Sequence, residues 1–515
     1  MLLGLLKDVM RFNKDLYLVI ASATVDSERF SRFFDGASVL NVPGRRFEVD
    51  IYYTKMAEAN YLDASIVAIL QIHVSQDAEG DILVFLTGQQ EIETVQELLE
   101  QRFETLQRNI QKSLPKLLIC PIYANLPPEL QADIFRETPK GYRKVVLATN
   151  IAETSLTIEG IRFVIDCGFC KQTSYNPRTG LESLLVVPIS RASAEQRAGR
   201  AGRTAPGKCF RLYTANAWEE ELEQEMVPEL LRTNLGNVVL LTKSLGIDNL
   251  LSFEFMDSPP PEMLIRALEQ LYALGALNDL GQLTKLGRKM AEFPIDPQLS
   301  RILISSSEYG VSEQLLTIVS MLSVGSSIYY RPKAKIVAAD HAHESFRSNF
   351  GDHLTLLNIY TMWEETNYSK EWCFEHFLQV KALRRARDVR EQLVGIMERV
   401  EVVVVENPDD DVAIRKALVS GLFYNVARLS SAGYKTVKGG QKVLLHPSSG
   451  LFEHEPKWVL YSELVLTSQK YMRCVSEIAP EWLREIAPHY YKDRDIDGGV
   501  DGSSRRKKGM PKILK

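Results

Sequence analysis

The sequence predicts an α/β parallel sheet in its first half, followed by a helical region and a small β-barrel. As far as about Tyr213, short runs of apolar and β-branched residues alternate with helical segments, the pattern of strands buried on both faces. Apolar residues then recur at helical spacing, and short, closely spaced strands follow near the end of the chain. These three observations divide the chain into regions of different architecture.

The composition is that of a soluble globular protein, with 45% hydrophobic and 25% charged residues. At ~100–200 residues per domain, 515 residues suggest three or four domains. Lys7 interrupts the apolar start too early for a signal peptide, and no apolar run approaches the ~18 residues of a membrane span, so we expect an intracellular protein. Six cysteines in 515 residues, of which only Cys167 and Cys170 have CxxC spacing, favour neither a disulfide framework nor a zinc site. The net charge of −5 gives no support to nucleic-acid binding, so any such site must be a local channel.

Five apolar runs are predicted strands of one parallel sheet. They cover residues 17–21, 81–86, 117–120, 144–148 and 163–166. A helix is predicted at 90–101, where one face carries Ile92, Val95, Leu98 and Leu99. Ligands bind at the carboxyl ends of parallel strands, where this chain places Thr, Gly, Asn, Ser and Asp residues.

The second half is predicted to be helical and then rich in strands. A proline cluster at 257–261 precedes a helix that stops at about Gly275, and helices continue to about Glu401. After a loop at 407–411, one more helix is predicted at 413–429. Strands are then predicted at residues 442–445, 458–465 and 471–476, a spacing that indicates a small barrel.

The string QRAGRAGR at residues 196–203 carries the clearest chemistry. Its arginines, Arg197, Arg200 and Arg203, recur every three residues, so on a helix Arg200 and Arg203 would share a face. Glycine and alanine between them allow close approach, and a guanidinium fork suits phosphate oxygens. The pattern predicts arginines that stabilise charge on a transferring phosphoryl group. The alternative is arginines on a solvated helix.

This string resembles motif VI of the DEAH-box helicases. Residues 148–158 (ATNIAETSLTI) resemble their motif V, residues 83–89 (LVFLTGQ) match motif IV, and residues 22–24 (SAT) match motif III. The resemblance extends through almost the whole chain. Its end, WLREIAPHYY at 482–491, is most similar to the splicing member that acts before the first splicing step.

The resemblance implies a fold and its domain boundaries. The implied fold class is an α/β parallel sheet (a second RecA-like domain) followed by a winged helix, a helical ratchet-like domain and an OB-fold β-barrel. The implied domains are a remnant of the first RecA-like domain at 1–47, the second RecA-like domain at 48–226, the winged helix at 227–294, the ratchet-like domain at 295–400, the OB-fold at 401–491 and a disordered tail at 492–515.

The resemblance also implies a nucleotide site. Gln196 would orient the attacking water, and Arg200 and Arg203 would contact the γ-phosphate. Phe135 would stack on adenine, and Glu159, where the family commonly has Asp, would lie near the ribose. The nucleotide-binding set further includes Gly199, and the resemblance implies no metal ligand in this chain.

Other segments are implied to contact RNA or to couple the two ligands. Thr149, Thr154 and Ser155 would lie near RNA phosphates, although short hydroxyls at such positions also cap helices and form turns. Coupling would involve Ser22, Ala23 and Thr24. The span 171–187 resembles the family's strand-parting β-hairpin, and by pattern alone it is an ordinary hairpin.

Three basic or polar features have two interpretations each. A run of basic residues on one predicted helix is either a solvated face or a wall of an RNA channel. The basic tail at 505–508 is either a solvated end or a nuclear-localisation or phosphate-contacting patch. His446 has no partner His or Cys nearby and is interpreted as a turn residue rather than a ligand or base. The basic run comprises Lys381, Arg384, Arg385, Arg387 and Arg390.

The chain contains no GxxxxGK[ST] string and no DEAH tetrapeptide. In the family both lie in the first RecA-like domain, where the P-loop holds the β- and γ-phosphates and an acidic motif positions Mg²⁺. We therefore expect ATP and Mg²⁺ to bind only if that domain is supplied, and this chain alone to hydrolyse ATP negligibly. Either the remnant of the first RecA-like domain at 1–47 is poorly ordered, or the sequence is an incomplete gene model or an alternative product.

Three functions compete on this basis. The first is an ATP-dependent RNA helicase that remodels the spliceosome in the nucleus, with RNA and spliceosome proteins as partners. The second is a nucleotide-independent module that binds RNA or protein. The third is a fragment that competes with the full-length enzyme for a glycine-rich (G-patch) activator, a partner class of this family.

Overall fold

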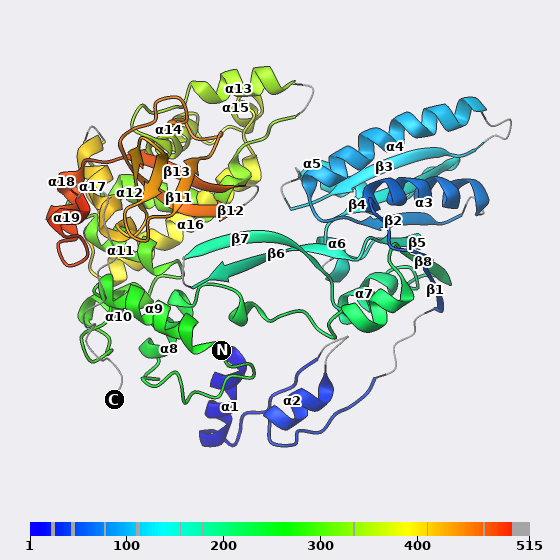
Figure 1. The fold of residues 1–515 in the computed structure, drawn as a ribbon, viewed down its shortest axis with the longest axis horizontal. Helices are drawn as coiled ribbons and strands as arrows, with labels where there is room; N and C mark the ends of the chain where they lie inside the picture. Colours follow the sequence, from blue (N-terminus) through cyan, green and yellow to red (C-terminus); the bar gives the residue numbers. More distant parts are fainter. Residues whose placement is uncertain are drawn as a thin grey trace. The chain divides into compact units, whose positions relative to one another are not determined.

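The structure is a computed structural model in which the chain forms two compact units (Figure 1). We call Leu5–Gln172 with Leu185–Pro228 the sheet unit, and Met1–Gly4, Thr173–Leu184 and Glu229–Lys515 the helix–barrel unit. The structure describes residues 1–21, 26–42, 47–76, 79–109, 114–124, 126, 128–154, 156–177, 180–332, 335–408, 410–466 and 469–496.

The sheet unit is built on six parallel strands in the order β1-β8-β5-β2-β4-β3. The predicted strands at 81–86, 117–120, 144–148 and 163–166 are confirmed as the four at the β3 end of this order. The Val, Ile and Leu side chains of β2, β4 and β5 are buried on both faces, as a parallel sheet requires, and Leu117, Leu118 and Ile119 of the edge strand β3 are half-buried. The strands are β1 (Val49–Tyr53), β2 (Asp81–Phe85), β3 (Lys116–Ile122), β4 (Tyr142–Ala148), β5 (Ile161–Asp166) and β8 (Gly207–Arg211).

Helices cover both faces of this sheet (Figure 1). On one face lie α3 (Tyr61–Ser75) and α4 (Gln89–Asn109), and the predicted apolar face of α4 is confirmed because Ile92, Val95 and Leu99 are buried against the strands. The other face is covered by α6 (Ile151–Thr154), α7 (Arg191–Ala198) and the 3-10 helix Ala132–Phe135, which follows α5 (Pro128–Gln131).

The predicted strand at 17–21 is wrong. The chain begins with α1 (Leu2–Phe12) and continues through α2 (Ser27–Phe33), and residues 17–21 form no regular element. Tyr17 and Val19 are each 88% exposed. A β-branched run forms a strand only where a neighbour accepts its backbone hydrogen bonds and covers its side chains, and no described strand pairs with this segment.

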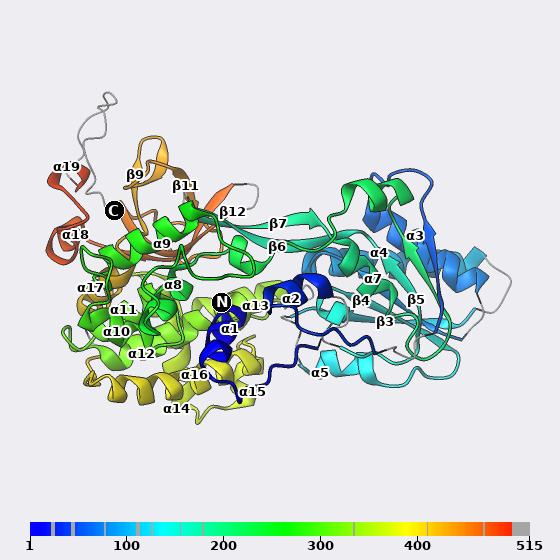
Figure 2. The same cartoon turned by 90° about the horizontal axis from the view of Figure 1, so that it is seen from below.

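The first part of the helix–barrel unit is helical (Figure 2). The predicted helix that stops near Gly275 is confirmed as α9, which starts with Pro261 in its first turn and ends two residues before Gly275, where φ is +77°. The helices are α8 (Gly236–Ser244), α9 (Pro261–Ala273), α10 (Lys285–Ala291), α11 (Pro297–Ser305), α12 (Ser312–Ser323), α13 (Ile336–Glu344), α14 (Asp352–Glu365), α15 (Lys370–Glu375) and α16 (Val380–Arg399).

A five-stranded barrel follows, in which β13 and β12 close the order β13-β11-β10-β9-β12. The strands predicted at 442–445, 458–465 and 471–476 are confirmed. The predicted helix at 413–429 is wrong in its second part, because α17 ends at Leu422 and Val426 pairs with the barrel strand β12. The elements are α17 (Asp411–Leu422), β9 (Val426–Ser430), β10 (Gly433–Thr436), β11 (Lys442–Leu445), β12 (Trp458–Leu466), β13 (Lys470–Glu477), α18 (Pro480–Ile486) and α19 (Asp493–Ile496).

The predicted hairpin is confirmed as β6 (Phe169–Asn176) and β7 (Leu181–Pro188). β7 adds to the barrel, since Glu182 pairs in parallel with Val465, and Leu181 is part of the barrel core. Two residues of the NPRTG turn, Arg178 and Thr179, lie outside the described residues, as does the basic tail at 505–508.

Candidate functional site

The motif V segment follows directly from the carboxyl end of β4. Thr149 is the first residue after the strand, and its amide donates to the carbonyl oxygen of Ile122 at 3.2 Å. The short helix α6 comes next, and residues 156–158 lead toward β5. The motif VI segment enters from α7, whose start is capped by the Ser190 hydroxyl, which accepts from the Ser193 amide at 3.1 Å.

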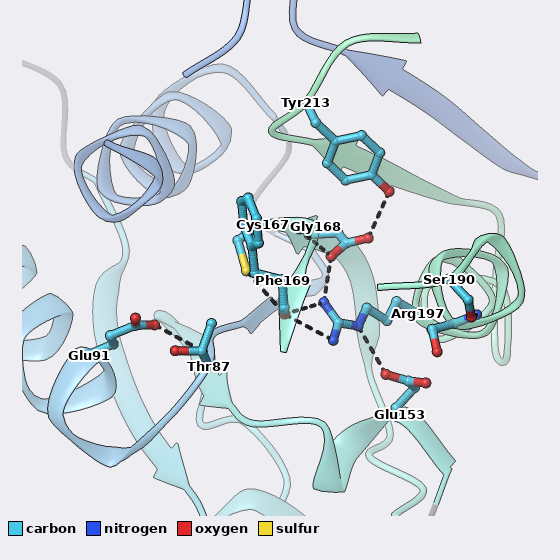
Figure 3. Close-up of polar contacts among 11 residues, drawn as sticks. Thr87, Glu91, Glu153, Cys167, Gly168, Phe169, Ser190, Arg197 and Tyr213 are labelled. Atoms are coloured by element: carbon cyan, nitrogen blue, oxygen red, sulfur yellow. Dashed lines mark hydrogen bonds and ion pairs between the residues drawn. The ribbon is translucent and has the colours of Figure 1, made fainter. Parts of the chain in front are cut away.

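Arg197 joins these two segments inside the sheet unit, as Figure 3 shows. Its side chain is fully buried. Nη1 donates to Asp166 Oδ1 at 2.7 Å, and Nε donates to Glu153 Oε2 at 3.1 Å. Both Nη atoms lie 3.3 Å from the carbonyl oxygen of Phe169, and the guanidinium stacks over the ring of Phe85 at 4.8 Å. One side chain therefore ties α7 to α6, β5, β2 and the first residue of β6.

Asp166, at the end of β5, organises the other side of this cluster. Its carboxylate accepts from the Gly168 amide at 3.0 Å and from the Tyr213 hydroxyl at 3.1 Å. Burial, followed by the charge of Asp166, raises the pKa of Tyr213. Burial alone would lower the pKa of Arg197, but the carboxylates of Asp166 and Glu153 outweigh it and raise that pKa, so Arg197 stays charged.

Arg200 and Arg203 do not lie on a helix, contrary to the sequence prediction. Helix α7 ends at Ala198, and both arginines lie in the turns that follow. In these turns Gly202 lies against the backbone of Phe47, whose amide donates to the Gly202 carbonyl at 3.0 Å, and a Cβ at Gly202 would approach the carbonyl oxygen of Phe47 to 2.6 Å. Both arginines nevertheless point to motif V: Arg200 Nη1 donates to the Leu156 carbonyl at 3.2 Å, and Arg203 Nη1 donates to the Thr157 hydroxyl.

The remaining nucleotide candidates are distributed around this cluster. Gln196 is half-buried on α7, and Gly199 caps the end of that helix. Phe135 is 54% exposed at the end of its 3-10 helix, and Glu159 is exposed in the turn before β5. In the described part of the chain, no polar or ring contact joins Phe135 or Glu159 to the arginines.

The RNA candidates of motif V lie on the surface beside the arginine cluster. Thr149 is half-buried, and Thr154 is exposed at the last residue of α6. Ser155 falls outside the described residues. The coupling candidates Ser22, Ala23 and Thr24 fall outside them as well.

The helix–barrel unit contains a large cavity of its own, of about 1060 Å³. The described tip of the hairpin, α9, α11, α13, α14 and the barrel line it. Tyr424 and Tyr490 lie side by side in its wall with ring centroids 4.5 Å apart, and Lys438 Nζ lies 5.5 Å from the ring of Tyr490. Such a wall offers ring faces and cations to a ligand. Its tyrosines are Tyr175, Tyr329, Tyr424, Tyr461 and Tyr490.

The basic run on α16 divides between two environments. Lys381, Arg384 and Arg385 are exposed. Arg387 stacks over the ring of Tyr368 at 5.0 Å, and Arg390 pairs with Glu313 on α12. The run is therefore part exposed surface and part packing surface.

His446 forms part of a turn in the cavity wall. Its Nδ1 lies 2.7 Å from the Ser448 hydroxyl and accepts from the Ser448 amide at 3.2 Å. The ring also lies edge-on to Tyr471. These contacts are those of a turn residue.

Sequence reasoning missed the roles of Arg197, Glu153 and Asp166. Two signals were available: Asp166 ends a buried strand, and Glu153 lies inside the string that resembles motif V. It also missed Tyr424 and Tyr490 as a pair, because they are far apart in the sequence and only the fold brings them together.

No described helix is both long and apolar enough to cross a membrane. Among the residues that the structure describes, no group of three or more His, Cys, Asp or Glu side chains is arranged to hold a metal ion.

Four family models match this chain, in the order of its structural regions. The helicase conserved C-terminal domain matches residues 64–205. The winged-helix and ratchet-like parts of the helicase associated domain match residues 267–295 and 296–356. The oligonucleotide/oligosaccharide-binding (OB) fold matches residues 414–490.

The six-stranded parallel sheet is that of a RecA-like domain, and the winged-helix, ratchet-like and OB-fold domains follow it in the chain. The helicase and OB-fold domains imply that the protein binds nucleic acid. Together, these domains in this order fit a helicase of the DEAH-box type.

Proposed function

We propose that this protein is an ATP-dependent RNA helicase of the DEAH-box family that remodels the spliceosome in the nucleus. The observation that supports this most directly is the convergence of three arginines on motif V. Arg197, Arg200 and Arg203 each donate a hydrogen bond to a residue between positions 153 and 157. A segment implied to bind RNA and a segment implied to bind the γ-phosphate are thus in direct contact.

The residues of the sheet unit fit a nucleotide. Arg200 Nε is buried and has no hydrogen-bond partner among the described residues, and a phosphate oxygen would satisfy it. The exposed ring of Phe135 is available to stack on adenine. Arg200, Arg203 and Gly199 would bind and orient the γ-phosphate, Gln196 would hold the attacking water, and Glu159 would contact the ribose. ATP with Mg²⁺ supplies the phosphoryl group, and its β- and γ-phosphates require the P-loop of a first RecA-like domain.

The 515 residues alone should therefore hydrolyse ATP negligibly. Arginines stabilise transition-state charge only when the phosphates and Mg²⁺ are held in place, and the sequence has no P-loop string. Phosphate release should be measured with and without single-stranded RNA. Robust RNA-stimulated turnover by these residues would contradict the proposal.

Single-stranded RNA binding by the helix–barrel unit is supported by the aromatic rings of its cavity. Stacking on an aromatic ring contributes ~1–3 kcal/mol per base, so Tyr424→Ala or Tyr490→Ala should weaken the affinity for a labelled oligonucleotide by about fivefold or more. Tyr272, an exposed tyrosine outside the cavity, is the matched control. Equal affinities for all three variants would remove the cavity from the RNA path.

The splicing assignment is supported by the resemblance of residues 482–491. Crosslinking the protein to RNA in nuclear extract tests it directly. Recovery of pre-mRNA and spliceosomal RNA, with spliceosome proteins and a G-patch activator, is the expected result. Recovery of ribosomal RNA alone would exclude it.

The second candidate is a nucleotide-independent fragment that binds RNA or competes for a partner of the full-length helicase. It is favoured by the lack of a P-loop string in these residues. The two candidates predict different effects of ATP on the affinity for RNA. Adding ATP to the protein as it occurs in cells should change its RNA affinity if it is the helicase, and should leave that affinity unchanged if it is the fragment.

A further inference from the structure

Glu153 is a carboxylate on the very segment that is proposed to bind RNA phosphates. It lies on α6, which begins two residues after Thr149 and ends at Thr154. Its side chain is 13% exposed, and Oε2 accepts from Arg197 Nε at 3.1 Å. A negative charge beside a phosphate site opposes binding, so its presence there needs a physical reason.

Charge balance does not supply that reason. Arg197 already pairs with Asp166 at 2.7 Å, and this buried pair is neutral without Glu153. With Glu153 the group carries two carboxylates for one guanidinium. The second carboxylate therefore contributes something other than neutralisation.

The geometry around Arg197 explains why a carboxylate stands at position 153. Asp166, the Phe169 carbonyl and the Phe85 ring hold the Arg197 guanidinium on three sides. Nε is the nitrogen that these contacts leave for α6, and Glu153 accepts from it. Because α6 is one turn of four residues, it has little stability of its own. A hydrogen bond to a fixed, buried cation sets where that turn lies.

We propose that Glu153 is a positioning residue that holds α6, and with it the hydroxyls of Thr149 and Thr154, in the arrangement that binds RNA phosphates. Arg197 is the fixed point of this contact, and α6 is the element that the contact holds. This inference rests on the proposed binding of RNA at motif V. It gives Arg197, the first arginine of the QRAGRAGR string, a role in RNA binding.

Electrostatics and positioning predict opposite results when the charge is removed. If Glu153 acts only through its charge, Glu153→Ala and Glu153→Gln both tighten RNA binding, because each removes an anion next to the phosphates. If Glu153 positions α6, the amide oxygen of Gln still accepts from Arg197 Nε, and only the Ala variant loses the contact. A weaker Ala variant beside an unimpaired Gln variant is therefore diagnostic.

The experiment measures the affinity of the whole chain for a fluorescently labelled single-stranded RNA by anisotropy at constant salt. We expect Glu153→Ala to bind about fivefold more weakly, as when the competent arrangement falls to about one fifth of the population. Glu153→Gln should bind as tightly as the unaltered chain or more tightly. An Ala variant that binds as well as the Gln variant would overturn the inference.

Glu195→Ala is the matched control. Glu195 also pairs with a buried arginine of the sheet unit, Arg211, at 2.7 Å, and among the described residues its carboxylate makes no hydrogen bond or ion pair with α6. A general loss of packing would weaken both Ala variants alike, whereas positioning predicts an effect at Glu153 alone. Equal weakening of the two would refute the specific role.

Glu153→Asp keeps the test decisive if the Ala variant fails to fold. It preserves the charge and shortens the side chain by one methylene, so positioning predicts weaker binding than the Gln variant, and a pure charge effect predicts the affinity of the unaltered chain. Absence of RNA binding by the unaltered chain would instead refute the proposed function.

Discussion

Arg197 and Asp166 form an ion pair from which water is excluded, with 2.7 Å between Nη1 and Oδ1 and no exposed side-chain surface on either residue. The pair connects the end of β5 to the helix that precedes the two arginines assigned to phosphate. Replacing one residue of such a pair strongly lowers the free energy of unfolding, because the remaining charge stays buried without its partner. This asymmetry leads to the first prediction.

Arg197→Met should destabilise the protein by ~3–5 kcal/mol, since Asp166 would keep a buried charge that no cation compensates. The surface pair of Arg162 with Glu79, at 3.4 Å, is the control, and Arg162→Met should cost ~1 kcal/mol or less. Urea denaturation of both variants measures the difference. Similar losses in the two would contradict the structural role of Arg197.

Arg200→Ala and Arg203→Ala should abolish catalysis without abolishing RNA binding, once a first RecA-like domain is present in the same chain. Arginine fingers contribute roughly 10³-fold or more to phosphoryl transfer, so kcat should fall by that order. RNA anisotropy in the absence of nucleotide provides the second readout. A parallel loss of RNA affinity would show that these arginines hold motif V rather than phosphate.

His353 should make the stability of the helix–barrel unit depend on pH. The ring is fully buried between the hydroxyls of Ser476 and Ser462, each 2.8 Å from a ring nitrogen, and burial lowers its pKa to about 4. The unfolded chain takes up this proton near pH ~6.5, so between that pH and about 4 the unfolded state binds more protons. The free energy of unfolding therefore falls as the pH is lowered through this window and is fully retained above it.

The test compares the unaltered protein with His353→Gln, which keeps a hydrogen-bonding side chain but does not titrate. The difference in stability between the two proteins removes the contribution of Asp352, which both contain. Burial raises the pKa of Asp352, so its effect on the pH dependence has the opposite sign. Urea midpoints measured across the window should converge or cross as the pH falls. Parallel curves would show that His353 does not carry the dependence.

Gly351→Ala should detach the start of α14 from β13. Gly351 has φ +126°, and a Cβ there would lie 2.3 Å from the Val475 carbonyl oxygen. Gly246 also has a positive φ, +86°, but a Cβ there would meet no atom within 4 Å. Gly246→Ala thus measures backbone strain alone, ~1–3 kcal/mol, and the melting temperature of Gly351→Ala should be clearly lower than that of the control.

The parallel sheet was predictable because its strands are short apolar runs bounded by polar residues. Val145, Val146 and Leu147 are fully buried, and such a run has few alternatives to a strand covered on both faces. Of the OB-fold strands, β11, β12 and β13 were predictable as short, closely spaced runs near the end of the chain. The segment around Val426 was not, because its helical pattern continues from α17 and only pairing with β12 turns it into a strand.

The sequence identified the two segments that meet in the candidate site, the motif V and motif VI strings, but not the geometry that joins them. The three-residue spacing of the arginines suggested a shared helical face, yet helix α7 ends at Ala198 and residues 199–203 form turns. A three-residue spacing places side chains on one face only where the chain is helical. Arg197 is the arginine that is buried because it contacts Asp166 and Glu153, which lie far from it in the sequence.

The addition of β7 to β12 means that the OB-fold is not a self-sufficient module. Excision of residues 401–491 would remove Leu181 from the barrel core and leave the outer edge of β12 without its neighbour at Val465 and Leu466. An open edge next to exposed apolar side chains favours self-association. A graft of this domain onto another protein would therefore need the hairpin as well, although more than two hundred residues of sequence separate the two segments.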